Sequence, residues 1–291
     1  KNYNIKNTEK IRHHPSRIAS NKLSYKSISG GDLSSAYHLK TQNQDYFLKI
    51  NSKKYASNMF ITEKEGLDTI AKTNTIATPK VYFIGSFKNY SYIIMEYLET
   101  TRPTPNALEK FGKQLAKLHQ TKAKEFGFGH NNFIGNLHQL NTYHNDWYSF
   151  YINKRLLPQI NLAKSKGFLS ENEVPNIIKM QSALDYLFKN VTPSLLHGDL
   201  WNGNFLIATN DVPYLIDPAS YYGHSEVDIA MSKLFGGFSP GFYNAYHNII
   251  PQDEHTNIRM EIYQLYYLLV HLNLFGRSYY RSVKSILSKY F

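Results

Sequence analysis

The sequence contains no cysteine, and this absence excludes three kinds of chemistry at once. Disulfide bonds, thiolate metal sites and cysteine nucleophiles all require a thiol. A chain without thiols suits a reducing compartment, so we expect a cytoplasmic protein. A hydrophobic share of 42% is that of a folded globular protein, which argues against a disordered chain.

Long hydrophobic runs are absent as well. Residues 1–10 are polar and cannot serve as the apolar core of a signal peptide. The most apolar later stretch, 262–275, is interrupted by Gln264, His271 and Asn273 and is too short to span a bilayer. We therefore expect a buried helix there, and no membrane association.

No run of five or more like charges occurs, although the formal net charge is +11. Such a charge can attract nucleic acid or another polyanion, so a polyanion-binding protein is one hypothesis for this chain. The lysines are scattered along the sequence, which favours solvated charges over a nucleic-acid site. We therefore expect no nucleic-acid partner.

Before about residue 99, short apolar runs separated by polar turns predict a small sheet. The expected strands are 23–28, 36–39, 46–50, 80–84 and 92–95. One helix is expected between the third and fourth strands, at about 57–72.

After a linker-like stretch at 99–106, helical periodicity dominates. Apolar residues first share one helical face at Leu108, Phe111, Leu115 and Leu118. Residues 143–164 and 173–189 also predict helices. The fold class is therefore α+β, with a strand-rich first third and a helix-rich remainder.

Two short strands at 205–208 and 213–216 flank an Asn-Asp turn, which predicts a hairpin. Asn204 precedes the first strand and Asp217 follows the second. Antiparallel pairing brings them to the same rim, because directly opposed residues have Cα atoms about 4.5–5.5 Å apart. An amide oxygen and a carboxylate at that separation can share one hard cation, and Mg²⁺ takes such ligands together with substrate phosphates.

Asp199 lies five residues before Asn204, on the loop that leads into the hairpin. With His197 the three residues form H-x-D-x-x-x-x-N, the spacing of a kinase catalytic loop. There the Asp accepts the proton of the substrate hydroxyl and the Asn binds metal. A lone carboxylate is usually a loop cap or a solvated side chain, but this combination favours catalysis. The His more often braces such a loop than reacts.

Phosphate binding would fall to the strand-rich part. Gly30, Gly31, Ser34 and Ser35 lie between two predicted strands, where backbone amides and hydroxyls can cradle phosphates. The stretch is neither G-x-G-x-x-G nor a Walker A sequence. Two glycines between strands are often only a hairpin turn, so both interpretations stay open.

Lys49 lies among apolar neighbours in a predicted strand. A strand lysine is most often solvated, but a kinase needs one to hold the α- and β-phosphates. In the following helix, Glu63 shares a face with the apolar Phe60 and Leu67. A carboxylate on a buried face is costly unless it is paired, so we expect Lys49 and Glu63 to form an ion pair.

These motifs resemble the fructosamine kinase (ketosamine 3-kinase) family, a branch of the aminoglycoside-phosphotransferase-like kinases. The resemblance runs from about residue 29 onward. Its most specific stretches are LHGDLWNGN (196–204), IDPA (216–219) and YGHSEVDIAM (222–231). Supporting stretches are 132–135, 271–276, and Asp146-Trp147 with Arg155-Leu156. Trp201, directly after the Asp-Leu pair, separates the chain from generic aminoglycoside or choline kinases.

The resemblance implies a bilobal protein-kinase-like fold. Residues 1–98 would form an N-lobe with a small antiparallel sheet and one helix, and would bind the nucleotide. Residues 99–291 would form a mainly helical C-lobe with the catalytic loop and the acceptor site. Motif match makes Asp199 the base, Asn204 and Asp217 the metal ligands, and Lys49 with Glu63 the phosphate-binding pair. The hinge whose backbone bonds to adenine would be Met95, Glu96, Tyr97 and Leu98.

The implied reaction uses ATP and Mg²⁺ to phosphorylate the 3-hydroxyl of ketosamines, which are ribulosamines or fructosamines on free amines or protein lysines. The phosphorylated adduct is unstable, so the reaction reverses glycation. A monomer is favoured. A kinase of another small hydroxyl substrate, such as an aminoglycoside, choline or homoserine, would share every ATP and metal residue and is the alternative within enzymes.

Three residues of the acceptor side keep two interpretations each. Trp201 can form an apolar wall for the sugar or pack the catalytic loop against the C-lobe. Glu226 and Asp228 can attract the amine of the substrate, or they can cap the following helix, because acidic residues suit a helix N-terminus.

Overall fold

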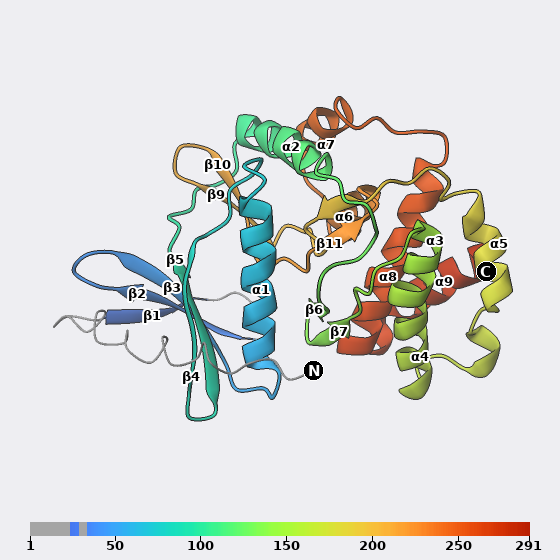
Figure 1. Ribbon diagram of the computed structural model, residues 1–291, viewed down its shortest axis with the longest axis horizontal. Coiled ribbons are helices and arrows are strands. Elements are labelled where there is room, and N and C mark those ends of the chain that lie inside the picture. Colours follow the sequence, from blue (N-terminus) through green and yellow to red (C-terminus); the bar gives the residue numbers. More distant parts are fainter. Residues whose placement is uncertain (1–23, 29–33) are drawn as a thin grey trace. The chain divides into compact units, whose positions relative to one another are not determined.

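The computed structural model describes residues 24–28 and 34–291 (Figure 1). The chain packs into two compact units. The first comprises the described residues up to Lys64 together with Pro79–Glu99, and the second comprises Glu65–Thr78 and Thr100–Phe291. Packing into two units does not decide what each part binds. That residues 1–98 bind the nucleotide and residues 99–291 the acceptor stays a prediction.

A five-stranded antiparallel sheet with the order β1-β2-β3-β5-β4 forms the body of the first unit. Its strands are β1 (Ser24–Ile28), β2 (Ser35–Lys40), β3 (Asp45–Asn51), β4 (Val81–Phe87) and β5 (Tyr90–Glu96). All five strands predicted from the sequence are confirmed. The register places Ala36, Lys49 and Ile93 opposite one another on neighbouring strands, so their side chains share one face.

Helix α1 (Ala56–Ala71) provides the predicted helix between β3 and β4. Its apolar positions Phe60, Leu67 and Ile70 are all buried, as the helical period requires. The side chain of Glu63 lies on the same side of the helix as these residues and meets Lys49 of β3. The pattern of the sequence therefore identifies correctly which face of α1 turns inward.

Helices make up most of the second unit. They are α2 (Pro105–His119), α3 (Trp147–Tyr151), α4 (Leu157–Ser165), α5 (Ile177–Asp185), α6 (Glu226–Leu234), α7 (Pro240–His247), α8 (Thr256–Phe275) and α9 (Tyr280–Tyr290). A π-helical turn (Ile152–Leu156) joins α3 to α4, and short 3₁₀ turns lie at Glu171–Glu173 and Arg277–Tyr279. Among the described residues, no helix is long and apolar enough to cross a membrane.

Three small strand pairs complete the second unit. They are β6 (Asn132–Ile134) with β7 (Leu137–Gln139), β8 (Ser194–Leu196) with β11 (Tyr221–Gly223), and β9 (Phe205–Ala208) with β10 (Val212–Leu215). Strand β8 leads into the loop that contains Asp199, and β11 follows the segment that contains Asp217. The hairpin β9–β10 lies between these two strands in the sequence.

Two predicted helices begin later than expected. The helix predicted at 143–164 starts at Trp147, because Asp146 caps it by accepting a hydrogen bond from the N–H of Ser149 at 2.8 Å. The helix predicted at 173–189 starts at Ile177, because Pro175 excludes a helical conformation for the residue before it, and Asn176 provides the cap. Capping side chains and proline thus decide both starts.

Helices α2 and α7 pack together more closely than side chains would allow. A Cβ atom at Gly112 of α2 would lie 2.2 Å from the carbonyl oxygen of Phe242 in α7, so the glycine lets the two backbones meet. Beside it, the ring of Phe111 is fully buried and stacks on Phe205 with centroids 4.9 Å apart. This contact anchors α2 next to the β9–β10 hairpin.

We expect Gly112→Ala to lower the free energy of unfolding by about 1–3 kcal/mol, because the added methyl group must push α7 away. Gly241→Ala in α7 is the matched control, since its Cβ would lie an ordinary 3.4 Å from Glu109 Cγ. Urea denaturation of both variants measures the difference. Equal unfolding midpoints for the two variants would contradict this packing.

Candidate active site

The β9–β10 hairpin places Asn204 and Asp217 at its open end. Leu215 of β10 pairs with Phe205 of β9, and the N–H of Ile216 donates to the carbonyl oxygen of Asn204 at 3.1 Å. The turn residues Asn210 and Asp211 both have positive φ, as a type I′ hairpin turn requires. The hairpin predicted from the sequence is therefore present, with Asn204 and Asp217 directly beyond its strands.

Asp199 lies beside Asn204 on the loop that enters this hairpin. Asn204 Nδ2 donates to the backbone oxygen of Asp199 at 2.8 Å and to its carboxylate Oδ2 at 3.0 Å. Burial raises the pKa of Asp199 from 3.8 to about 7; the hydrogen bond from Asn204 opposes this shift, and the negative charges of Asp217 and Asp228 add to it. A carboxylate with a pKa near neutrality is suited to accept and release a proton.

His197 braces the loop, as the sequence pattern suggested. Its Nε2 lies 2.8 Å from the carbonyl oxygen of Ile216, and its Nδ1 accepts the backbone N–H of Asp199 at 3.2 Å. The ring is buried, and burial lowers its pKa, which favours the neutral imidazole. One ring therefore links the residue before Asp217 to Asp199.

Gly198, between His197 and Asp199, is required by two geometric conditions. Its φ is +86°, a left-handed conformation that glycine adopts without steric cost. A Cβ atom there would also lie 2.1 Å from the carbonyl oxygen of Ala219. Its own carbonyl oxygen accepts a 2.7 Å hydrogen bond from Tyr267 of α8. The catalytic loop and the segment after Asp217 thus lie backbone against backbone.

Asp228, which the sequence suggested as a substrate residue or a helix cap, lies in the first turn of α6 and binds the backbone of the loop that leads to Asp199. Its carboxylate accepts the backbone N–H groups of His197 at 2.7 Å and Gly198 at 2.9 Å. His119 Nε2 lies 3.1 Å from the same carboxylate, and Tyr246 OH lies 2.7 Å from His119 Nδ1. The side chain of Asp228 is fully buried. These contacts favour a structural role over contact with the acceptor.

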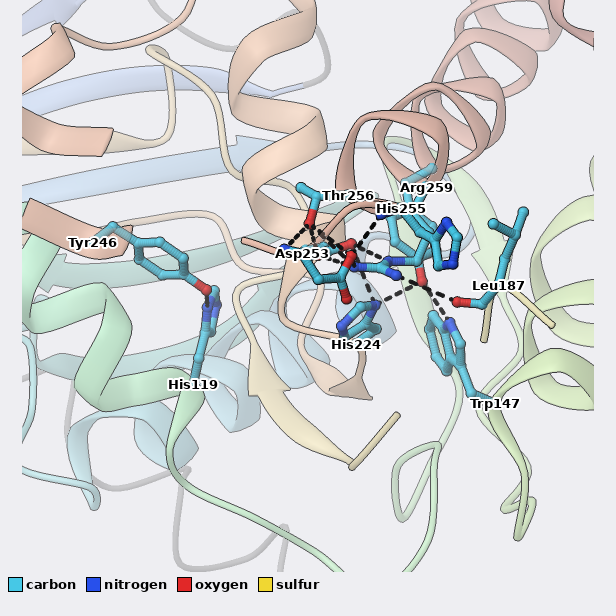
Figure 2. Close-up of polar contacts among 11 residues, drawn as sticks. His119, Trp147, Leu187, His224, Tyr246, Asp253, His255, Thr256 and Arg259 are labelled. Atoms are coloured by element: carbon cyan, nitrogen blue, oxygen red, sulfur yellow. Dashed lines mark hydrogen bonds and ion pairs between the residues drawn. The ribbon is translucent and has the colours of Figure 1, made fainter. Parts of the chain in front are cut away.

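Glu226 is the other acidic residue at the start of α6, and it forms a buried ion pair. Arg259 donates to its two carboxylate oxygens at 2.6 Å each. Figure 2 shows Arg259 with two further partners of this ion pair. The hydroxyl of Thr256 donates to Glu226, and Arg259 also donates to Asp253. Because its oxygens are already bonded, Glu226 holds α6 against α8 and is poorly placed to attract the amine of a substrate.

Trp147 and His224 extend this cluster (Figure 2). Both bond to the hydroxyl of Tyr263, at 2.9 Å from Trp147 Nε1 and 2.8 Å from His224 Nδ1. Burial lowers the pKa of His224 to about 4, so this ring is neutral at physiological pH. Arg259 therefore pairs with two carboxylates, those of Glu226 and Asp253, and the neighbouring His224 ring is neutral.

In the first unit, Lys49 and Glu63 form the predicted ion pair, with 2.7 Å between Nζ and Oε1. Both side chains are mostly buried, at 13% exposure. Ser34 Oγ accepts a hydrogen bond from Asn51 at 3.2 Å, and Ser35 opens β2. Gly30 and Gly31 lie outside the described residues. The phosphate-binding roles of all these positions stay predictions.

The predicted hinge residues lie at the end of β5. Met95 is buried, and the backbone N–H of Glu96 donates to the carbonyl oxygen of Lys80 at 2.8 Å. Tyr97 stacks on His38 with ring centroids 3.7 Å apart, and Leu98 follows it in the chain. This arrangement holds the strand end in place; adenine binding there stays a prediction.

Comparison with known proteins places this geometry in a family. The sequence model of the fructosamine kinase family matches residues 6–291. The chain belongs to this family. It is 40% identical over 269 residues to a probable ketoamine kinase of Vibrio parahaemolyticus, covering 90% of each chain. It is 38% identical to a chloroplastic protein-ribulosamine 3-kinase of Arabidopsis thaliana, covering 91% of this chain and 81% of the relative.

Solved structures agree with the predicted fold class. A candidate fructosamine-3-kinase from Haemophilus somnus superposes with a TM-score of 0.84 at 29% identity, covering 94% of this chain and 93% of the other. The aminoglycoside phosphotransferase APH(4)-Ia superposes with a TM-score of 0.61 at 17% identity over 94% and 95% of the two chains. The second likeness concerns the fold alone. This fructosamine kinase family member therefore has the protein-kinase-like fold that its motifs predicted.

The donor atoms at the hairpin rim suit a hard divalent cation. Both hydrogen bonds of the Asn204 side chain use Nδ2, so its amide oxygen can serve as a ligand, and the charge of Asp217 lies close enough to raise the pKa of Asp199. Within the described ranges, no cluster of three or more His, Asp or Glu side chains could hold a metal ion on its own. Two oxygen ligands completed by substrate phosphates are the usual arrangement for Mg²⁺, so these residues fit the predicted ion.

Trp201 lies on the catalytic loop of this family member and keeps 38% of its surface exposed. The ring packs over Gly203, where a Cβ atom would lie 2.4 Å from the indole. The next side chain, Asn202, bonds to the carbonyl oxygen of Gly237 at 2.8 Å. The indole thus has one face packed on its own loop and part of its surface open, which is compatible with both roles that the sequence suggested.

The contacts of Asp228 predict a large effect on stability. We expect Asp228→Ala to lower the free energy of unfolding by about 3–5 kcal/mol, because it leaves two buried N–H groups and His119 without their acceptor. Asp228→Asn keeps one acceptor oxygen and should lose less. Asp185→Ala, at an exposed position of α5, is the control. A variant that keeps its stability but binds ketosamine more weakly would instead make Asp228 a substrate residue.

Proposed function

We propose that this protein is a ketosamine 3-kinase, which transfers the γ-phosphoryl group of ATP to the 3-hydroxyl of ribulosamines and fructosamines. The observation that carries the proposal is the arrangement of Asp199, Asn204 and Asp217 around one hairpin rim, in a member of the fructosamine kinase family. The relative from Arabidopsis thaliana named as a protein-ribulosamine 3-kinase supports ribulosamines on proteins as substrates.

Asp199 acts as the base in this reaction. Its carboxylate accepts the proton of the acceptor hydroxyl as the hydroxyl oxygen attacks the γ-phosphorus and the bond to the β-phosphate oxygen breaks, which releases ADP. The raised pKa of Asp199 suits this task, because a base with a pKa near 7 both takes the proton and returns it to solvent. No covalent intermediate on the protein is needed.

Asn204 and Asp217 would hold Mg²⁺ together with the β- and γ-phosphates of ATP. When bound, the ion offsets the negative charge that develops on the phosphoryl oxygens. Asn204 also donates to the carboxylate of Asp199, so one side chain aligns the base with the cation site. This hydrogen bond holds the carboxylate of Asp199, which would accept the proton, next to Asn204, which would bind the cation.

Lys49 would bind the α- and β-phosphates, and Glu63 keeps its ammonium group in place through their 2.7 Å contact. The exposed part of Trp201 would form a wall for the sugar. Since phosphorylation at the third carbon destabilises the adduct, the reaction would remove sugars from amines and protein lysines. We place this repair activity in the cytoplasm and expect a monomer.

The direct test is phosphate transfer from MgATP to ribulosyl-lysine and fructosyl-lysine, read by mass spectrometry. We expect transfer to both, and a loss of about 10²–10⁴-fold in Asp199→Asn, because the amide cannot accept the proton. Asp185→Asn, at an exposed position, should keep full activity.

Choline, homoserine and an aminoglycoside serve as competing acceptors in the same assay. Transfer to one of them, with none to the two ketosamines, would contradict the substrate class while leaving the kinase intact. An absence of transfer to every acceptor would contradict the kinase itself.

A further inference from the structure

Asp217 holds a conformation that its own backbone disfavours. Its φ is +54°, in the left-handed region, which costs a residue other than glycine about 1–3 kcal/mol when the surroundings impose it. The flanking backbone is bonded on both sides: His197 contacts the carbonyl oxygen of Ile216 at 2.8 Å, and the N–H of Ala219 donates to the carbonyl oxygen of His197 at 2.9 Å. The hydrogen bonds on either side of Asp217 therefore hold its backbone in this conformation, and with it the orientation of its side chain.

Two further carbonyl groups of this segment are bound by buried amide side chains. Gln139 Nε2 donates to the carbonyl oxygen of Ala219 at 3.1 Å, and Asn132 Nδ2 donates to that of Ser220 at 2.9 Å. Asn132 Oδ1 accepts from Gln139 at 2.8 Å and from Asn141 at 2.9 Å. We call Asn132, Gln139 and Asn141 the amide cluster; none of the three is more than 4% exposed.

Arg155 lies behind the amide cluster with a fully buried side chain. Its guanidinium donates to Asn141 Oδ1 at 2.7 Å and to the carbonyl oxygen of Leu140 at 2.6 Å, and it lies 3.9 Å from the ring centre of Tyr221. In the part of the chain that the structure describes, no carboxylate is within ion-pair distance of it. A buried cation without a carboxylate is costly, so carbonyl oxygens and aromatic rings must offset its charge.

This guanidinium sets the direction of the hydrogen bonds made by Asn141 and Asn132. Arginine only donates, so Asn141 must present its oxygen to Arg155 and its amino group to Asn132. Asn132 must then accept with its oxygen and turn its own amino group to Ser220. Tyr266 orients Gln139. Its hydroxyl donates to Gln139 Oε1 at 2.7 Å, so Gln139 Nε2 must point to the carbonyl oxygen of Ala219.

We infer that Arg155, Tyr266 and the amide cluster are positioning residues, which hold the backbone after Asp217 so that its carboxylate points to the cation site. This inference rests on the proposed role of Asp217 as a metal ligand. Sequence patterns did not indicate this role, although stretches around Asn132 and Arg155 belong to the family resemblance. Outer contacts that orient metal ligands typically change metal affinity by 10–100-fold when removed.

The test measures Mn²⁺ binding by electron paramagnetic resonance, with the intact chain and a non-hydrolysable ATP analogue. We expect Asn132→Leu to weaken Mn²⁺ binding about tenfold. Asn273→Leu is the matched control, because Asn273 is also buried and donates to Gln159 at 2.9 Å, where it joins α8 to α4. Thermal unfolding is followed for both variants, so that loss of stability and loss of metal binding are compared.

Tyr266→Phe keeps the test decisive if Asn132→Leu does not fold, because it removes a single hydroxyl. It should weaken Mn²⁺ binding in the same direction, whereas Tyr151→Phe should not, since the Tyr151 hydroxyl bonds only to backbone oxygens of α8 at 2.9 and 3.4 Å. Unchanged Mn²⁺ affinity in Asn132→Leu and Tyr266→Phe would overturn the inference.

Asp217→Asn separates this result from a failure of the proposed function. If it abolishes Mn²⁺ binding while the Asn132 and Tyr266 variants bind normally, only the positioning inference is wrong. If it binds Mn²⁺ as tightly as the unchanged chain, the metal site itself is wrong, and the inference that rests on it is overturned too.

Discussion

The two hydrogen bonds that Asp228 accepts from the backbone of His197 and Gly198 are the interaction on which the candidate active site depends. They fix the loop immediately before Asp199, and the same loop supports Asp217 through the contact between His197 and Ile216. Loops are usually mobile, but here a fully buried carboxylate from α6 replaces the backbone partners that a helix or sheet would supply. Asp199 and the backbone next to Asp217 are thereby held by one connected set of hydrogen bonds.

Electrostatics explains why this arrangement suits a cation and a phosphate donor. Asp199, Asp217 and Asp228 lie close enough for each of the other two to raise the pKa of Asp199. The protein therefore concentrates negative charge at the rim, and Asp228 compensates its own share with backbone N–H groups and His119. The remaining charge at the rim is the kind that a divalent ion offsets. The backbone that follows Asp217 in the chain accepts hydrogen bonds from the buried amides of Gln139 and Asn132.

Much of this could be predicted from the sequence, because the signals are local. The strands of the first unit follow alternating apolar patterns, and the hairpin is marked by its turn residues. The motif from His197 to Asn204 lies within one loop. A carboxylate on the apolar face of a helix needs a cation, so Glu63 predicts an ion pair with Lys49. In each case the residues that define the feature belong to one loop, to one hairpin, or to a strand and the helix that follows it.

The remaining features depend on contacts between distant parts of the chain. His119 and Asp228 are 109 residues apart, and Asn132 and Ser220 are 88 apart. The composition at the start of α6 suggested a cap or a substrate contact, but the partners of Glu226 and Asp228 come from α8 and the catalytic loop. Buried amides have no periodicity to reveal them.

The most direct test of the account is the position of a bound Mn²⁺, located by anomalous diffraction in crystals grown with a non-hydrolysable ATP analogue. The account predicts a peak about 2 Å from both Asn204 Oδ1 and a carboxylate oxygen of Asp217, and in contact with the phosphates. A nucleotide bound in the crystal with the ion at other side chains, and with neither Asn204 nor Asp217 in its coordination shell, would contradict it.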